Sequence, residues 1–330
     1  MKAIVIDKPG DESCMKLGVA DAPVLGPGMV RIRNVACGVN RADLLQRQGF
    51  YPPPPGASPI LGLECAGHIA EIAADVKGFA PGDRVMALLP GGGYAEESVV
   101  DAGSVIRLPD ALTFEEGAGS IETLLTVFLN VFQLAGLPEG GTVLVHGGGS
   151  GIGTTAIDLV TRAGGRIVVT AGSEEKCRRC LELGAAAAAN YRSEDWVAVA
   201  REASGGRGVD VVLDSIGAPY LDGNLRALAD DGALVLIGLM GGAKAEIPLG
   251  VLLARRLRLI GSTLRTRSAA QKAAIVAAFL ARFGADFEAG RIRPILHRVF
   301  PLEQASEAHR LLKASGHFGK VVLRIADAAA

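Results

Sequence analysis

Residues 142–153, with the sequence TVLVHGGGSGIG, constrain the fold of this chain more than any other segment. A short apolar stretch rich in β-branched residues meets a glycine-rich turn, and apolar residues then recur at helical spacing from Ile152 to Val160. The pattern predicts a strand, a tight turn and a helix. The N–H groups in the first turn of such a helix have no intrahelical partner, and the helix dipole favours an anion there. We therefore expect this turn to bind a phosphate.

The match of this turn to the dinucleotide-binding pattern G-x-G-x-x-G is incomplete. Gly148 and Gly153 take the first and third positions, but Ser150 stands in the second. Serine is small enough for close approach by a pyrophosphate, and its hydroxyl is able to donate to it. A turn with only a packing role would show the same local pattern, so the surrounding sequence decides between the two interpretations.

The segment 142–261 alternates between strand and helix patterns. We expect strands at 142–146, 166–170, 186–190, 209–214, 233–239 and 257–261, and helices at 151–163, 174–183, 193–203 and 219–229. Parallel strands joined by helical crossovers form a doubly wound sheet, and the glycine-rich turn follows its first strand. The sequence therefore predicts an α/β fold with a six-stranded parallel sheet and a dinucleotide site at this turn.

The rest of the chain differs, because residues 1–120 consist of short β-rich stretches between Pro- and Gly-rich turns. This predicts a compact barrel-like or sandwich domain. Thr113, followed by Glu115 and Glu116, is typical of a helix start. The tail has two helical stretches and a closing strand pattern that would complete the β-rich domain. We expect one domain at 1–121 and 265–330, a nucleotide-binding domain at 122–264, and a cleft between them that holds the chemistry.

The bulk properties exclude several classes of partner. The 330-residue chain has a net charge of −1, so nothing favours binding to nucleic acid or to an anionic membrane surface. The first 20 residues lack the pattern of a signal peptide, and we see no apolar run of membrane-spanning length. Five scattered cysteines favour a reducing cytoplasm without a disulfide framework.

The second strand of the predicted sheet indicates which dinucleotide binds. NAD-specific folds place Asp or Glu at the end of this strand, where the chain has Ala171 and Gly172. Hydroxyl and cationic side chains follow nearby: Ser173, Lys176, Tyr191 and Arg192. The missing acid and these neighbours favour a 2′-phosphate, and so NADPH. Lys176 and Arg192 could instead be ordinary surface residues, and Glu174 and Glu175 count against NADPH unless they point to solvent.

Metal ligands are sparse in the sequence. Cys37, Cys65 and His68 have no spacing typical of a closed tetrahedral site. Cys177 and Cys180 form a CRRC motif, but it falls within a predicted helix of the nucleotide-binding domain. A metal or redox role for this motif is the alternative to two structural thiols on one helix. We expect no metal.

Motifs along nearly the whole chain resemble one family. They include GVNRADLLQRQGFYPPPPG (38–56), ILGLECAGHIAE (60–71), PGDRVMALLPGGGYAE (81–96), HGGGSGIG (146–153), GLMGG (238–242) and HFGKVVL (317–323). The chain resembles the zinc-free quinone oxidoreductase branch of the medium-chain dehydrogenase/reductase superfamily, and most of all its tumour-suppressor-inducible subgroup. The resemblance implies a GroES-like catalytic domain, an inserted Rossmann domain, and homodimers; a tetramer of paired dimers is the alternative assembly. Zinc-bearing relatives have cysteine, histidine and cysteine ligands at the positions of Asn40, Leu63 and Glu122.

The resemblance also implies site residues. Asn40, Asp43 and Tyr51 would lie in the cleft, with Asn40 on the nicotinamide ribose or the quinone oxygen, Tyr51 on the acceptor, and Asp43 holding the loop. Asp43 as a helix cap and Tyr51 as a surface aromatic are the alternatives. The residues expected around the cofactor are Thr126, Gly148, Ser150, Gly151, Ile152, Gly153, Ser173, Lys176, Tyr191, Gly238, Leu239, Met240, Phe318, Gly319 and Lys320. Phe318 on its own would more often be a core residue.

The resemblance implies NADPH-dependent hydride transfer to a small-molecule quinone, with small or ortho-quinones expected as the best acceptors. The alternatives are an enal or enone reductase that uses the same cleft, and a non-catalytic NADPH-binding protein. Hydride transfer to an activated acceptor needs little acid–base help, so the protein must mainly align cofactor and acceptor. The stretch 256–262, RLRLIGS, would be a sheet edge that pairs with its mate in a dimer.

Overall fold

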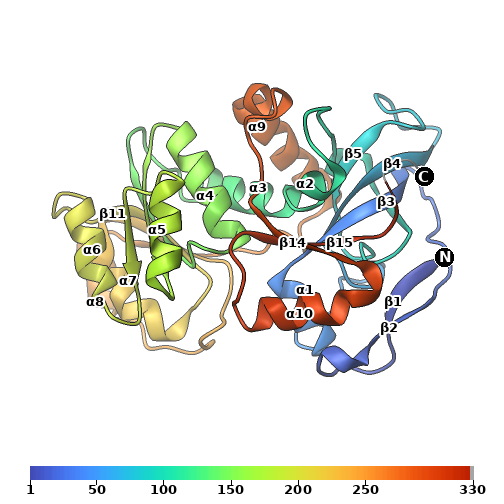
Figure 1. Ribbon diagram of the computed structural model, residues 1–330. Helices are drawn as coiled ribbons and strands as arrows, with labels where there is room; N and C mark the ends of the chain where they lie inside the picture. Colours follow the sequence, from blue (N-terminus) through green and yellow to red (C-terminus); the bar gives the residue numbers. More distant parts are fainter. Residues whose placement is uncertain (328–330) are drawn as a thin grey trace. The chain divides into compact units, whose positions relative to one another are not determined.

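The computed structural model describes residues 1–327, which divide into two compact units (Figure 1). Unit 1 comprises Met1–Leu125 together with the chain from Leu264 onward, and unit 2 comprises Thr126–Thr263. Glu122 was expected in the nucleotide-binding domain but belongs to unit 1. Its backbone N–H donates to Oε2 of Glu64 at 2.9 Å, which ties the start of this helix to the β-rich unit.

Unit 1 is built on a seven-stranded sheet with strand order β14-β15-β3-β4-β5-β7, and β6 also pairs with β3. The strands are β3 (Met29–Val39), β4 (Glu64–Ile72), β5 (Arg84–Leu88), β6 (Glu97–Asp101), β7 (Val105–Arg107), β14 (Leu296–Pro301) and β15 (Lys320–Arg324). The closing strand β15 lies antiparallel to β3, with Val321 opposite Val39. The predicted completion of the N-terminal domain by the tail is therefore confirmed. A separate two-stranded sheet pairs β1 (Lys2–Ile6) with β2 (Met15–Val19).

Two helices of unit 1 follow a residue, Thr113 or Ser268, whose side chain accepts from a free backbone N–H of the first turn. The helices of this unit are α1 (Arg41–Arg47), α2 (Phe114–Ala118), α9 (Ala269–Glu288) and α10 (Ala305–Lys313), while α3 (Ile121–Val127) runs from unit 1 into unit 2. Thr113 starts α2 through a capping box with Glu116, as the sequence predicts. The helical stretch after it is not continuous. It breaks into α2, α3 and a π-helical segment η3 (Phe128–Leu134), where Ala135 N–H donates to the carbonyl of Asn130.

Unit 2 is a six-stranded parallel sheet with strand order β10-β9-β8-β11-β12-β13, which confirms the doubly wound topology. The strands are β8 (Thr142–His146), β9 (Arg166–Ala171), β10 (Ala187–Asn190), β11 (Val209–Asp214), β12 (Leu228–Leu236) and β13 (Arg258–Gly261). The helices are α4 (Gly151–Arg162), α5 (Glu174–Glu182), α6 (Trp196–Ala203), α7 (Leu221–Ala227) and α8 (Leu249–Arg255). The first strand in sequence lies at the centre, so the glycine-rich turn opens where the strand order reverses.

The fifth strand differs from its prediction. β12 begins at Leu228 rather than at 233, because Leu228 already pairs with Val209 of β11 before the register shifts. It ends at Leu236, so Gly238–Met240 follow the strand instead of ending it. Met240 N–H then donates to the carbonyl of Ser215 at 3.1 Å. The segment after β12 is therefore held against the turn after β11.

Within residues 1–327, no helix of either unit is long and apolar enough to cross a bilayer.

Candidate functional site

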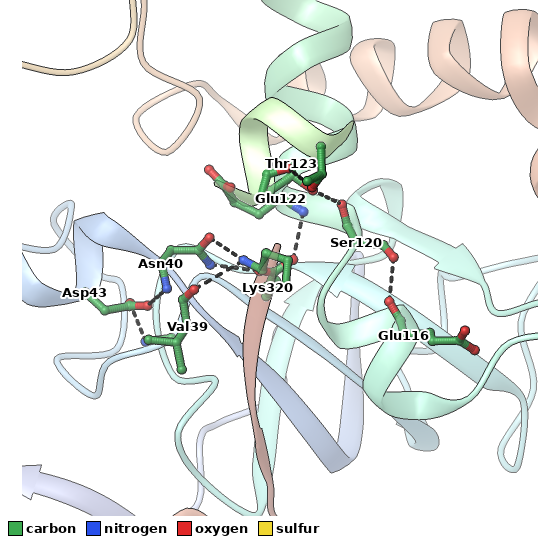
Figure 2. Close-up of polar contacts among 12 residues, drawn as sticks. Val39, Asn40, Asp43, Glu116, Ser120, Glu122, Thr123 and Lys320 are labelled. Carbon is green, nitrogen blue, oxygen red and sulfur yellow. Dashed lines mark hydrogen bonds and ion pairs between the residues drawn. The ribbon is translucent and has the colours of Figure 1, made fainter. Parts of the chain in front are cut away.

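Asn40 stands where β3 ends and α1 begins, and its side-chain amide is held at both ends (Figure 2). Lys320 Nζ donates to Asn40 Oδ1 at 2.6 Å, and Asn40 Nδ2 donates to Glu64 Oε1 at 2.8 Å. Only 8% of the residue is exposed. An amide has two N–H donors on nitrogen, so one donor of Asn40 is left without a partner among residues 1–327. The amide is therefore oriented and keeps one hydrogen-bond donor for a ligand.

Lys320 is a buried cation that serves Asn40 and Glu64. Its ammonium donates to Val39 O at 3.3 Å, to Asn40 Oδ1 at 2.6 Å and to Glu64 Oε1 at 2.7 Å. The side chains of Lys320 and Glu64 are 4% and 0% exposed. Because an ammonium has three N–H donors, all of them are used inside unit 1. This arrangement does not favour the expected contact between Lys320 and the cofactor, because the Lys320 ammonium is already paired with Glu64.

Glu64 was missed in the sequence, although a glutamate in the apolar stretch ILGLECAG is an unusual core residue. Its second oxygen accepts from the Glu122 backbone N–H. Figure 2 shows how the turn before α3 is held: Thr123 Oγ1 donates to the Ser120 carbonyl at 3.0 Å. Room for Glu64 depends on Gly38, because a Cβ there would lie 2.2 Å from Glu64 Oε1.

Asp43 holds the loop from inside. Its carboxylate accepts from the backbone N–H of Asn40 at 2.8 Å and of Gly62 at 3.1 Å, and from the Tyr94 hydroxyl at 3.3 Å. Burial is the main cause that raises the pKa of Asp43 to about 6, against the hydrogen bonds that lower it. Asp43 is 0% exposed, and its hydrogen bonds agree with the expectation that it holds this loop. It acts on Asn40 through the backbone N–H of that residue.

A chain of buried donors extends behind Asp43. Arg47 Nη1 lies 3.4 Å from His309 Nδ1, and the Tyr94 hydroxyl lies 3.0 Å from His309 Nε2. Arginine only donates, so His309 Nδ1 must accept and His309 Nε2–H must donate to Tyr94, whose own proton goes to Asp43. Burial, followed by the Arg47 charge, lowers the pKa of His309 to about 3, which agrees with a neutral ring.

Tyr51 follows α1 in a loop without helix or strand, and it is half-buried. The guanidinium of Arg265 lies 5.1 Å from the centre of its ring, at a distance typical of a cation–π contact. Burial raises the pKa of the Tyr51 hydroxyl. Tyr51 therefore remains neutral and is packed on one face.

The late residues of the expected cofactor set lie at the start of β15. Phe318 is buried in the core of unit 1. Gly319 has a φ of +89°, and a Cβ there would lie 2.1 Å from the Ile295 carbonyl oxygen, so the chain needs glycine at this position. The buried Phe318 side chain agrees with the core alternative.

The positions of the zinc ligands in related enzymes carry other side chains. Leu63 is buried, and Asn40 and Glu122 take part in the contacts with Glu64 described above. In the described part of the chain, His, Cys, Asp and Glu side chains form no group of three suited to holding a metal ion.

In unit 2 the glycine-rich turn leads into α4 through Ser150. The Ser150 hydroxyl accepts from the Gly153 N–H at 3.0 Å, so it is the N-cap of the helix. Gly148 N–H donates to the Thr170 carbonyl at 2.8 Å. The N–H groups of Gly151 and Ile152 have no partner within residues 1–327. Of the five residues expected in the cradle, these two offer free backbone donors, and the others shape it.

Two of the glycines are needed for close approach. A Cβ on Gly148 would lie 2.7 Å from Val169 in β9, and one on Gly153 would lie 2.4 Å from the Gly148 carbonyl oxygen. These contacts let α4 start directly against the turn and let the turn pack on the sheet. The incomplete sequence pattern therefore has the geometry of a phosphate cradle.

The end of β9 carries the features expected around a 2′-phosphate. The Tyr191 hydroxyl lies 2.5 Å from the place that a Cβ on Gly172 would take, so the hydroxyl stands where NAD-specific folds have their acid. Ser173 is the N-cap of α5 and accepts from the Lys176 backbone N–H at 3.3 Å. Burial lowers the pKa of Lys176.

Glu174 and Glu175 are the two acidic residues that count against NADPH unless they point away from it. Glu174 Oε1 accepts from Asn190 Nδ2 at 2.6 Å and from Ser193 Oγ at 3.4 Å, so its carboxylate is committed to the turn after β10. Glu175 is exposed to solvent.

The remaining residues of the expected set lie apart from this turn. Thr126 is buried in α3, and its carbonyl accepts from Asn130 Nδ2. Leu239 and Met240 are exposed beyond the carboxyl end of β12. Cys177 and Cys180 are both buried in α5, and burial raises the pKa of Cys180 to about 12. Two buried neutral thiols favour the structural interpretation of the CRRC motif.

A buried polar network joins β8 and β11, between which the strand order reverses. His146 ends β8 and lies 2.7 Å from Asn224 Oδ1, while Asn224 Nδ2 donates to Asp214, the last residue of β11, at 2.9 Å. Asp214 also accepts from the Gly217 N–H at 3.2 Å. Sequence reasoning missed this network. It fixes the turns at the edge where doubly wound sheets bind ligands.

Comparisons with known proteins agree with this architecture. Residues 26–110 match the alcohol dehydrogenase GroES-like domain, and residues 151–280 match the zinc-binding dehydrogenase family. Quinone oxidoreductase of Lama guanicoe is 31% identical over 328 residues, covering 98% of this chain and 97% of that protein.

Solved structures give the same result over both units. Quinone oxidoreductase of Escherichia coli complexed with NADPH matches with a TM-score of 0.87 at 26% identity, covering 98% of this chain and 100% of that chain. A structure described as an NAD-dependent alcohol dehydrogenase matches with a TM-score of 0.85 at 33% identity and the same coverage. The chain therefore belongs to the medium-chain dehydrogenase/reductase superfamily and is an oxidoreductase of the kind represented by the quinone oxidoreductases.

Proposed function

We propose that this protein is an NADPH-dependent quinone reductase that needs no metal ion. The observation that carries the proposal is the amide of Asn40, which Lys320 and Glu64 orient and which keeps one free N–H. Full-length similarity to quinone oxidoreductases supports the substrate class.

The residues of unit 1 would act on the acceptor. The free N–H of Asn40 donates to a carbonyl oxygen of the quinone, where negative charge develops as the ring is reduced. The Lys320 ammonium on Asn40 Oδ1 polarises the amide, and this makes the N–H a stronger donor. Tyr51 contacts the acceptor ring. The proton for the reduced oxygen comes from water, so no side chain is assigned as a general acid.

The residues of unit 2 would hold the cofactor. NADPH supplies the hydride when bound. Gly151 and Ile152 donate their N–H groups to the pyrophosphate at the start of α4, and Ser150 is able to donate its hydroxyl proton. Ser173, Lys176 and Tyr191 surround the 2′-phosphate. Thr126 and the segment Gly238–Met240 contact the nicotinamide half. Phe318 and Gly319 also contact the cofactor. Lys320 acts on the acceptor through Asn40.

The test combines cofactor and acceptor panels. NADPH and NADH are titrated against the protein, and turnover is then measured with small quinones, ortho-quinones and enones. We expect tighter binding of NADPH and quinone turnover that exceeds enone turnover. Equal or tighter binding of NADH would reject the cofactor assignment. Faster turnover of enones would make the protein an enone reductase, and binding of NADPH without turnover would make it a non-catalytic binding protein.

Asn40→Ala isolates the acceptor site. We expect kcat/KM for the quinone to fall by about a hundredfold, since one hydrogen bond to a developing oxyanion contributes on that scale, while the Kd for NADPH is unchanged. Asn34→Ala is a control, because Asn34 of β3 is also a buried asparagine with a held amide but lies outside the acceptor site: its Nδ2 donates to the Ala95 carbonyl and to Ser98 Oγ, both at 2.8 Å. A value of kcat/KM within about twofold of wild type would remove Asn40 from the site.

We also propose a homodimer in a reducing compartment such as the cytoplasm. β13 is an edge strand of the six-stranded sheet, so one side of it has no strand partner in the described chain. All five cysteines are free thiols, which supports the reducing compartment.

A further inference from the structure

Arg265 joins three separate parts of unit 1. Its Nε donates to the Pro90 carbonyl at 2.8 Å, its Nη1 to the Tyr51 carbonyl at 3.3 Å, and its Nη2 to Gln46 Oε1 at 2.7 Å. The same guanidinium faces the Tyr51 ring. Gln46 in turn donates to the Pro59 carbonyl at 2.9 Å.

The segment between α1 and β4 depends on these contacts. No helix or strand lies between Arg47 and Glu64 in the structure. Four prolines at 52–55 have no backbone donor, so backbone pairing inside residues 51–59 is limited to the turn in which Ala57 N–H donates to the Pro54 carbonyl at 3.0 Å. Arg265 fixes it at Tyr51 directly and at Pro59 through Gln46. A connection of this length without secondary structure is typical of a binding loop.

The charge of Arg265 is costly where it stands. The residue is 5% exposed, and its three hydrogen-bond acceptors are neutral carbonyl and amide oxygens. No carboxylate of residues 1–327 forms an ion pair with it. Burial lowers the pKa of Arg265, an effect that the Asp43 charge opposes without direct contact, and the buried cation Lys272 adds repulsion between like charges. A buried cation without a counter-ion is unfavourable for stability. What it offers is a rigid planar fork that meets three acceptors at fixed angles.

We propose that Arg265 is the positioning residue that fixes Tyr51 and residues 48–60, and so determines which quinones the protein accepts. The inference rests on the proposed quinone reduction, with Tyr51 on the acceptor. When Arg265 joins Gln46, Tyr51 and Pro90, the Tyr51 ring is held at a fixed place with one face open. Because the ring and its loop cannot move aside, bulky quinones are rejected. Without the fork, the loop samples several positions, so small quinones bind less tightly and the rejection of bulky ones is lost.

The experiment compares Arg265→Met and Arg265→Lys with wild type in the presence of NADPH. The matched control is Arg293→Met. Arg293 also donates to two carbonyls and one side chain, at Gly290, Ala111 and Glu116, but touches none of the three parts. Amide hydrogen exchange of residues 48–60 measures the loop. Steady-state kinetics with a substituted benzoquinone and a bulky naphthoquinone measure selection.

In Arg265→Met we expect faster exchange in 48–60 and a KM for the small quinone raised about tenfold, with kcat within about twofold, because binding and not the chemical step is affected. The ratio of kcat/KM between small and bulky quinone falls towards one. Arg265→Lys recovers part of both effects, and Arg293→Met changes neither. If Arg265→Met does not fold, Gln46→Ala removes one acceptor and gives a smaller change in the same direction.

Two results would overturn the inference. Unchanged exchange in 48–60 would show that Arg265 does not hold the loop. Faster exchange with unchanged KM and unchanged selection would show that the loop does not select quinones. Failure of the wild-type protein to reduce any quinone would instead reject the proposed function, while the exchange measurement would still decide whether Arg265 holds the loop.

Discussion

At the scale of single residues, the site is built from buried polar side chains that each have one possible role. Arg47 can only donate, so the tautomer of His309 and the direction of the Tyr94 hydroxyl follow from it. The chain of donors ends on Asp43, which accepts from the Asn40 backbone. The opposite tautomer of His309 would place its Nδ1–H against an N–H of Arg47, at a cost of about 1 to 3 kcal/mol for each unsatisfied group. Asn40 is therefore held by groups that cannot rearrange cheaply.

The lowered pKa of His309 predicts that the stability of the protein depends on pH. Its pKa is lowered to about 3 in the folded protein from an ordinary value near 6.5, so the unfolded chain takes up a proton first as the pH falls. Its contribution is complete above about pH 6.5 and is lost towards pH 3, with a slope of up to about 1.4 kcal/mol per pH unit. His309→Gln keeps one donor and one acceptor but does not titrate.

Urea unfolding of wild type and His309→Gln between pH 7 and 5 measures this slope. We expect the free energy of unfolding of the wild type to fall relative to that of the variant as the pH falls. Asp43 has the opposite sign, because its raised pKa makes its contribution decline as the pH rises through about 6, but it is present in both proteins. A constant difference between the two proteins across this range would contradict the prediction.

Variants of Lys320 and Glu64 distinguish an effect on stability from an effect on catalysis. Lys320→Met leaves Glu64 buried without its cation, and breaking such a pair costs about 3 to 5 kcal/mol. Adding Glu64→Gln removes the uncompensated charge, so most of the stability should return. The polarisation of the Asn40 amide does not return, so kcat stays about tenfold or more below wild type in both variants.

Thermal unfolding and quinone turnover of the single and double variants check this. A double variant that regains both stability and kcat would show that Lys320 acts only by keeping unit 1 folded. The Kd for NADPH is the control, and we expect it to be unchanged because the ammonium already has three acceptors inside unit 1.

At the scale of elements, the turn between β8 and α4 shows why small residues are needed at some positions and not at others. Ser150 uses its oxygen as the N-cap and so occupies the Gly153 N–H. Gly153 itself is needed because the helix starts against the Gly148 carbonyl. The free N–H groups of Gly151 and Ile152 stay directed outward as a result. The second glycine of the usual pattern is replaced by a residue that organises the helix start.

Gly153→Ala tests this geometry. Its Cβ would lie 2.4 Å from the Gly148 carbonyl oxygen, so the turn must move away and the cradle must change shape. We expect the Kd for NADPH to rise by about tenfold or more, as for the loss of a charge-assisted hydrogen bond. Gly250→Ala, a helical glycine of α8 with no atom within 4 Å of the added Cβ, is the control and should leave the Kd unchanged. Equal Kd values for Gly153→Ala and wild type would contradict the assigned cradle.

At the scale of the whole molecule, the helix that precedes the edge strand of unit 2 carries two exposed leucines. Leu249 and Leu253 of α8 are 70% and 83% exposed, and β13 follows this helix directly. Apolar side chains gathered beside an open edge strand are typical of a surface between subunits. The surface supports the proposed homodimer.

Replacing both leucines by lysine tests the dimer. Leu249→Lys with Leu253→Lys puts like charges on the surface that would face its own copy, so we expect a monomer where the wild type is a dimer. The fold of the chain itself should be unchanged, because both side chains are exposed in it, and circular dichroism checks this. Light scattering after size-exclusion chromatography measures the mass. A wild-type monomer, or a variant that stays dimeric, would reject α8 as part of the interface.

Local patterns in the sequence were sufficient for the architecture. Strand and helix periodicity between 142 and 261 predicted the six-stranded sheet, and the glycine-rich turn predicted the cradle, because each depends on residues close together in the chain. The absence of an acidic residue at Gly172 is likewise visible in the local sequence. Boundaries were less certain: β12 starts early because it pairs with β11, a contact that periodicity does not contain.

Only the tertiary structure decided how the site is held. Lys320 reaches Asn40 across 280 residues, His309 reaches Tyr94 across 215, and Arg265 reaches Tyr51 across 214. Each of these polar groups sits in a core position that would be unfavourable without its distant partner, so no local pattern predicts it. The sequence by itself determined the sheets and the phosphate cradle. Folding determined which charge orients Asn40 and which fork holds Tyr51, since those contacts exist only after remote strands and loops have come together.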